Sequence, residues 1–94
     1  MGIIYGVFNH TRKEFVQPAD LPVEGSDPVS FPYSAFIVNL LMNSWRHEHV
    51  VVLDDSGDIQ CDWDLSKKYK DRSVELWNEF VTLYGGLLPG LIKV

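Results

Sequence analysis

The chain of 94 residues has little of several features that would indicate a class of protein at once. A single cysteine excludes an internal disulfide and is typical of a reducing compartment. No apolar run reaches the roughly 18 residues of a membrane-spanning helix, and no basic start precedes an apolar signal core. The 8 basic residues are outnumbered by 13 acidic ones, which argues against a general nucleic-acid binder. We therefore expect a cytoplasmic protein with no membrane partner.

The sequence also lacks the motifs of common catalytic sites. It contains no Gly-x-Ser-x-Gly motif, no cysteine–histidine signature and no glycine-rich phosphate loop. Cys61 alternates with polar residues on the same side as Ile59 and Trp63, as a small core residue would. We therefore predict no catalytic residue, no cofactor and no enzyme activity.

Two histidines form the best candidate for a metal site. His47 and His49 would share one face of a strand and could both reach one zinc ion. The third and fourth ligands stand at no recognisable spacing, and His10 is far away in the sequence. We therefore predict no metal site, and a small metal-dependent hydrolase remains an alternative.

The residues that are present predict one globular domain over residues 1–94. Hydrophobic residues make up 46% of the chain and aromatic residues 13%, which is enough for a real core. Apolar periodicity predicts strands at 3–8, 14–16, 50–53 and 58–63, and helices at Ser34–Trp45 and Ser73–Tyr84. The fold class is therefore α+β, with an antiparallel sheet of about four strands, two helices on one face, and β-β-α-β-β-α order.

The apolar residues also indicate which sides of these elements are buried. The strand at 3–8 is apolar on both faces, so we expect it to be central. The helix Ser34–Trp45, with Ser34 as its cap, is apolar over much of its girth, so we expect it to be well buried with Trp45 in the core. The inward stripe expected for the second helix is Val74, Trp77, Val81 and Tyr84, with Phe80 beside it.

Two segments fall outside these elements. Residues 17–32 hold four of the 5 prolines, so we expect a loop that forms neither a helix nor a central strand. Residues 87–94 are too apolar for a free end, and we expect them to fold back, as an edge strand for example, or to meet a partner.

Charge is segregated along the sequence. Residues 47–66 carry six acidic side chains and neither lysine nor arginine. A face with this charge would attract a basic partner and speed its association. We predict a partner-binding face made of Asp55, Asp58, Asp62 and Asp64, with Tyr33 as a neighbouring contact.

A basic run follows the acidic one. Residues 67–72 carry four cations around Tyr69, a combination that could contact phosphates while the ring stacks on a base. A solvated loop that balances the neighbouring acidic hairpin also explains it, and is the interpretation we prefer.

The opening of the chain adds a resemblance. The segment from Tyr5 to Phe15 contains Asn-His-Thr-Arg-Lys-Glu-Phe and resembles the opening of a group of small bacterial proteins. A helix that ends near a tryptophan and an acidic hairpin then follow, as Trp45 and Asp54-Asp55 do here. These proteins are similar in size and acidity to immunity proteins that neutralise bacterial toxins.

The resemblance and the charge pattern together predict a protein-binding module. The expected function is an immunity-type inhibitor that occludes a basic toxin or nuclease domain through its acidic hairpin. The alternative from another class is a structural or homodimeric protein that assembles through the apolar tail, with Leu87, Leu88, Leu91 and Ile92 in contact.

Overall fold

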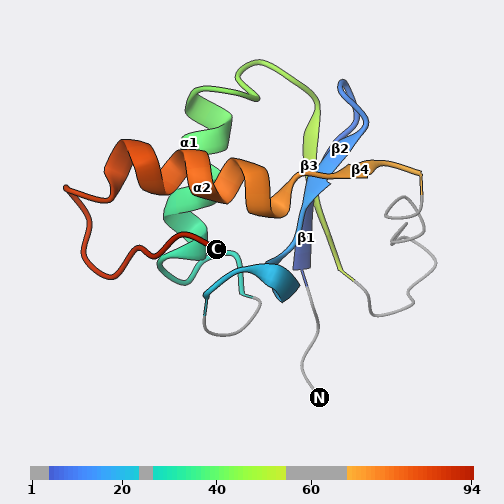
Figure 1. The fold of residues 1–94 in the computed structure, drawn as a ribbon. Coiled ribbons are helices and arrows are strands. Elements are labelled where there is room, and N and C mark those ends of the chain that lie inside the picture. The colour runs from blue at the N-terminus through green and yellow to red at the C-terminus, as the bar shows by residue number, and fades with distance from the viewer. Residues whose placement is uncertain (1–4, 24–26, 55–67) are drawn as a thin grey trace.

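The computed structural model describes residues 5–23, 27–54 and 68–94. The strands are β1 (Tyr5–Asn9), β2 (Glu14–Val16), β3 (Val50–Asp54) and β4 (Lys70–Asp71), and the helices are α1 (Tyr33–Met42) and α2 (Ser73–Tyr84). Both helices lie on one side of a four-stranded sheet (Figure 1). The predicted α+β class and element order are confirmed. Within the described ranges, no helix has the length and apolar character needed to cross a membrane.

The sheet has the order β3-β1-β2-β4 and is mixed rather than wholly antiparallel. β1 pairs antiparallel with both β2 and β3, whereas β2 pairs parallel with β4, with Glu14 opposite Lys70. The parallel pair departs from the prediction because β4 is a two-residue strand directly before α2, at a place where no strand was predicted. The predicted strand at 58–63 lies outside the described residues.

The central strand β1 separates two apolar surfaces, as its run of apolar residues predicted. Val7 and Val16 face the helices and belong to the main core. Alternation sends Phe8 and Phe15 to the opposite face, where their rings stack with centroids 5.0 Å apart. The sheet therefore buries side chains on both of its faces, and the helices cover one of these faces.

Helix α1 begins one residue before the predicted start and ends three residues before the predicted end. Pro32 occupies the N-cap position without a side-chain cap, so Ser34 does not cap the helix as expected. At the other end Asn43 stops the helix, because its side chain donates to the Asn39 carbonyl (3.2 Å). Trp45 follows in a turn and is buried in the core, as predicted.

Helix α2 has the predicted bounds. Asp71 caps it by accepting a hydrogen bond from the Ser73 amide (2.8 Å), and Gly85 is its C-cap residue, where any Cβ would lie only 2.6 Å from the Val81 carbonyl oxygen. The buried side is rotated from the predicted stripe. Val74 is 38% exposed, while Leu76 is buried. The two aromatic residues of the helix that pack against α1 set this rotation, and they are Trp77 and Phe80.

The proline-rich segment was expected to form neither a helix nor a central strand, and the expectation of no helix is wrong near its start. A 3₁₀ helix spans Pro18–Asp20, and Pro18 and Leu21 are buried. Proline is compatible with the first turn of a helix because its missing N–H has no partner there anyway. Residues 24–26 of the segment lie outside the described ranges. The segment thus contributes to the core.

The apolar tail folds back onto α2 without forming a strand. Trp77 Nε1 donates to the Ile92 carbonyl (2.7 Å), and the Val94 amide donates to Asn78 Oδ1 (2.8 Å). Leu88 and Leu91 pack against the core. The fold-back was predicted, and the strand that was offered as its form is absent from residues 87–94.

Candidate functional site

The residues predicted to bind a partner fall in two places. Asp55, Asp58, Asp62 and Asp64 lie outside the described residues, and the acidic segment continues from the end of β3. Tyr33 is placed in the core, with 2% of its surface exposed, and its hydroxyl donates to the Tyr5 carbonyl (3.1 Å). Burial raises the pKa of the Tyr33 hydroxyl, which keeps it protonated as a donor. In this fold Tyr33 ties α1 to β1.

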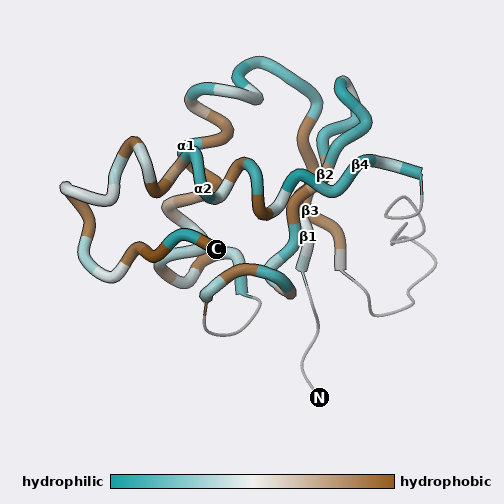
Figure 2. The backbone as a smooth tube through the Cα atoms, viewed as in Figure 1, coloured by the Kyte–Doolittle hydropathy of each residue, from teal (hydrophilic) through white to brown (hydrophobic). Residues whose placement is uncertain are grey.

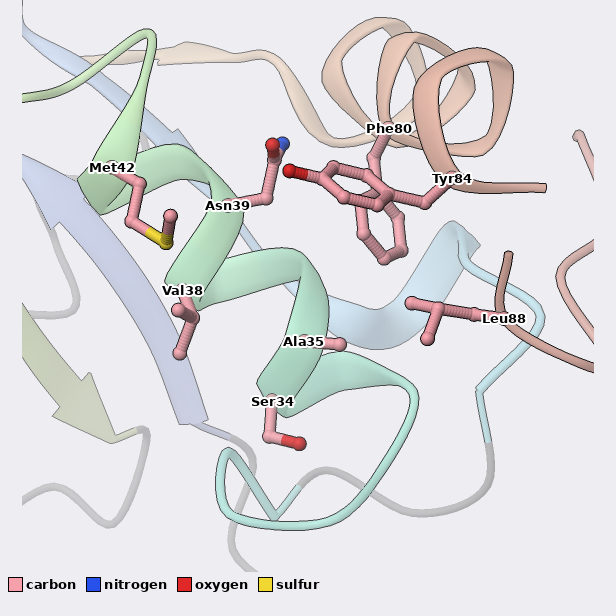
Figure 3. A pocket seen from close by; sticks show the side chains of 8 residues that line it. All are labelled: Ser34, Ala35, Val38, Asn39, Met42, Phe80, Tyr84 and Leu88. Atoms are coloured by element: carbon pink, nitrogen blue, oxygen red, sulfur yellow. The ribbon is translucent and has the colours of Figure 1, made fainter. Parts of the chain in front are cut away.

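An open groove of about 410 Å³ lies between α1 and α2 (Figure 3). This volume lies within the range of natural ligand pockets. Eight residues line it, namely Ser34, Ala35, Val38, Asn39, Met42, Phe80, Tyr84 and Leu88. One side of the groove comes from α1, and the other comes from α2 and the segment directly after it, which are distant from α1 in the sequence.

Helix spacing explains the α1 wall. Its five groove residues recur at steps of one, three and four along α1, which is one stripe of a helix. The stripe starts with two small side chains, Ser34 and Ala35, which leave room beside Phe80 and Leu88 of the opposite wall. The groove therefore follows from small residues on α1 facing large ones across the gap.

The groove continues onto an apolar surface of α1. Val38 is 52% exposed and Met42 is 59% exposed, and Leu41 beside them is also exposed. The sequence predicted a well-buried helix because apolar residues surround it, and this prediction is wrong. A helix on one face of a small sheet, with one helical neighbour, cannot have every side covered. Grouped exposed apolar residues of this kind mark interaction surfaces.

Two polar groups converge at one end of the groove. Figure 3 shows the Asn39 amide and the Tyr84 hydroxyl pointing toward one another across it. Asn39 Oδ1 accepts from Asn43 Nδ2 (2.8 Å). Among the described residues, none is hydrogen-bonded to Asn39 Nδ2 or to the Tyr84 hydroxyl. An apolar groove with a few convergent polar groups is the usual composition of a binding site.

The histidine pair predicted for metal binding does not have the expected geometry. His47 lies in a turn with φ of 63°, before β3 begins at Val50, so His47 and His49 do not alternate along a strand. His47 instead accepts from Arg46 Nε (3.0 Å), while the ring of His49 lies 4.7 Å from that of His10. In the part of the chain that the structure describes, no three His, Cys, Asp or Glu side chains are grouped to hold a metal ion.

The tail residues predicted for self-association divide between two roles. Leu88 and Leu91 pack internally, and Leu87 and Ile92 are exposed. Two of the four tail residues predicted to form a dimer contact therefore pack into the core of the chain itself.

Comparisons with protein-family models, with curated proteins and with solved structures find no match for this chain.

None of the groove residues was predicted as a site residue. Ser34 was expected as a cap and Tyr84 as a core residue, because local patterns describe one helix at a time. The available signal was the excess of apolar residues on α1, which exceeds what one buried face requires.

Proposed function

We propose that this chain is a protein-binding module that recognises a basic partner protein and acts by occlusion. The observation that supports this most directly is the apolar surface formed by the groove and the exposed side chains of α1. A standard protein interface takes about 800 Å² from each partner, which is about one-seventh of the 5826 Å² surface of this chain. The groove and the adjoining face of α1 would form the apolar centre of such an interface.

Charge supports a basic partner. Neither α1 nor α2 contains lysine or arginine, and the only charged residues of the two helices are Glu75 and Glu79. The acidic run of residues 47–66 adds the negative charge that would steer a basic partner toward the chain. A bacterial toxin or nuclease domain is the partner that the resemblance of the opening segment favours, with this chain as its immunity-type inhibitor.

The first experiment identifies and then titrates the partner. The tagged chain is used to capture proteins from its native cells at low salt and at high salt, and the captured proteins are identified by mass spectrometry. We expect one stoichiometric basic protein that high salt releases. Recovery of the chain alone at both salt concentrations, or as a self-dimer in sedimentation, would contradict the proposal.

Substitutions in the groove test the contact surface with the purified partner. Val38→Ser with Met42→Ser removes two exposed apolar side chains from the groove without adding charge, so we expect at least ten-fold weaker binding and an unchanged melting temperature. Leu83→Ser is the matched control, because Leu83 is an exposed apolar residue of α2 that lines no part of this groove. Equal affinity of the double variant and the wild type would remove the groove from the interface.

The acidic segment is tested separately by kinetics. Asp58, Asp62 and Asp64 changed together to asparagine should slow association, with a smaller effect as salt rises. Association rates that do not change at low salt would show that the segment takes no part in steering.

A further inference from the structure

The tertiary structure gathers most of the positive charge of the chain at one end. Residues 10–13, 46–49 and 68–72 carry six of the 8 Lys and Arg residues and all 3 histidines. Backbone hydrogen bonds join these segments, from the Lys70 amide to the Lys13 carbonyl (3.0 Å) and from the His10 amide to the His49 carbonyl (2.8 Å). We call these three segments the cationic end. Figure 2 shows it as the hydrophilic tip of β1 and β2 with the neighbouring turn and β4.

The acidic residues of the cationic end are already engaged. Glu48 pairs with Arg12 at 2.7 Å, and Glu14 pairs with Arg72 at 2.6 Å. Asp71 caps α2. The cations that have no acidic partner among the described residues are Lys13, Arg46, Lys68 and Lys70, and all four are exposed. They leave a local surface of positive charge on a chain whose net charge is −5.

Three aromatic rings lie in the same three segments, and the ring of His10 contacts the other two. The His10 ring is 4.7 Å from that of His49 and 5.8 Å from that of Tyr69, measured between centroids. His10 Nδ1 and the Tyr69 hydroxyl are hydrogen-bonded at 2.9 Å, which fixes the orientation of both rings. His49 is exposed, and His10 and Tyr69 are half-buried. The rings therefore form an ordered platform that is open to solvent on part of its surface.

Backbone strain marks the same place. Lys13 has φ of 56° and His47 has φ of 63°, and no other described non-glycine residue has positive φ. Glycine adopts this conformation without the penalty that a Cβ brings. Strain of this kind often accompanies functional positions. The cationic end thus has a lysine and a histidine at two positions where glycine would adopt the same backbone conformation without strain.

We propose that the cationic end binds single-stranded nucleic acid, with the four unpaired cations on phosphates and the ring platform against a base. Cations that follow a backbone beside stacking rings are the usual composition of single-strand binding surfaces. The rings favour a nucleic acid over an acidic protein, because charge alone would serve the latter. The composition of the whole chain did not predict this surface, because its excess of acids lies elsewhere along the sequence.

Binding is measured by fluorescence anisotropy with a labelled twelve-nucleotide oligouridylate and a matched oligothymidylate. Four phosphate contacts give a slope of log K against log salt of about −2.8 for a single strand, so affinity should fall about 50-fold between 50 and 200 mM salt. Lys13, Lys68 and Lys70 changed together to glutamine should reduce the slope to about −0.7. Lys93→Gln is the matched control, since Lys93 lies in the tail.

Two single variants separate function from folding. Lys13→Gly removes one cation and relieves the positive-φ strain, so we expect weaker binding with an equal or higher melting temperature. Tyr69→Leu should weaken oligouridylate binding about five-fold or more while leaving heparin binding unchanged, because stacking requires a base. Both variants are checked by circular dichroism.

Several outcomes would overturn the proposal. The first is that the chain does not bind the oligonucleotide at 50 mM salt. The second is that the triple glutamine variant binds with the affinity of the wild type. The third is that a polyglutamate peptide binds more tightly than the oligonucleotide. Equal losses for heparin and oligouridylate in Tyr69→Leu would equally show a polyanion surface without base recognition. Met42→Glu should bind the oligonucleotide as tightly as the wild type does. The test of the cationic end is therefore independent of the groove.

Discussion

Replacing Trp77 with alanine is expected to remove a large share of the free energy of unfolding of the chain. The Trp77 side chain is fully buried, and its ring centroid lies 5.3 Å from Phe36 of α1 and 5.5 Å from Phe80 of α2. Its Nε1 also holds the Ile92 carbonyl of the tail. Truncating a buried tryptophan costs about 3–5 kcal/mol, and a small domain has about 5–15 kcal/mol in total. Urea unfolding followed by circular dichroism measures the loss.

A control on the same helix makes this measurement specific. Val74→Ala removes an apolar side chain that is 38% exposed, and we expect less than about 1 kcal/mol of destabilisation. If both variants unfold at similar urea concentrations, Trp77 does not join the two helices as the structure indicates.

Trp77→Phe separates the packing of the ring from its hydrogen bond. Phenylalanine keeps an aromatic ring in the core but has no N–H, so the Ile92 carbonyl loses its donor. We expect carboxypeptidase to remove the tail faster from this variant than from the wild type. Digestion at the wild-type rate would mean that apolar packing of Leu88 and Leu91 holds the tail without this bond.

The second large effect is expected at Arg72, which joins β2 to α2. Its guanidinium contacts Glu14 at 2.6 Å and Glu75 at 2.7 Å. Burial lowers the pKa of Arg72, but hydrogen bonds to Glu75 and Glu14 outweigh this effect and raise the pKa overall. The Glu14 side chain is only 14% exposed, and its Oε1 has no hydrogen-bond partner among the described residues. The largely buried Glu14 carboxylate therefore depends on the Arg72 guanidinium to compensate its charge.

We expect Arg72→Met to destabilise the chain by about 3 kcal/mol. The substitution keeps an apolar stem but leaves a largely buried carboxylate without its cation, which costs about 3–5 kcal/mol in fully buried pairs. Adding Glu14→Gln removes that stranded charge, so the double variant should be more stable than Arg72→Met alone. Urea unfolding of the wild type, both single variants and the double variant measures the coupling.

Glu75→Gln gives the matched comparison on the other partner of Arg72. Glu75 is 57% exposed, and an exposed ion pair contributes about 0–1 kcal/mol. A loss at Glu75 as large as that at Arg72 would show that the exposed pair, rather than the pair with Glu14, carries the stability.

The elements with strong local signals could be predicted from the sequence. Helix α2 has the predicted bounds because Asp71 caps its start and Gly85 stops it, and both signals act within one turn. The central position of β1 followed from its apolar residues on both faces, and β1 does lie between β2 and β3. The buried side of α2 was predicted only in part: Trp77, Phe80 and Val81 turn inward as expected, but Leu76 does so in place of Val74.

The surfaces proposed for function could not be predicted in this way. The groove exists because Ala35 of α1 faces Phe80 of α2, residues that are 45 positions apart in the numbering. The predicted site residues were chosen by charge along the sequence. The partner-binding role of the four aspartates stays a prediction, whereas Tyr33 lies in the core.

What the sequence alone determined is the class of the fold, the order of its elements and the bounds of the helix with the clearest caps. These depend on periodicity and on caps that act over a few residues. Only the tertiary structure decided the parallel pairing of β2 with β4, the exposed side of α1 and the gathering of the cations. Each of these depends on which distant segments lie together, as Lys13 and Lys70 do, and no local pattern specifies such a pairing.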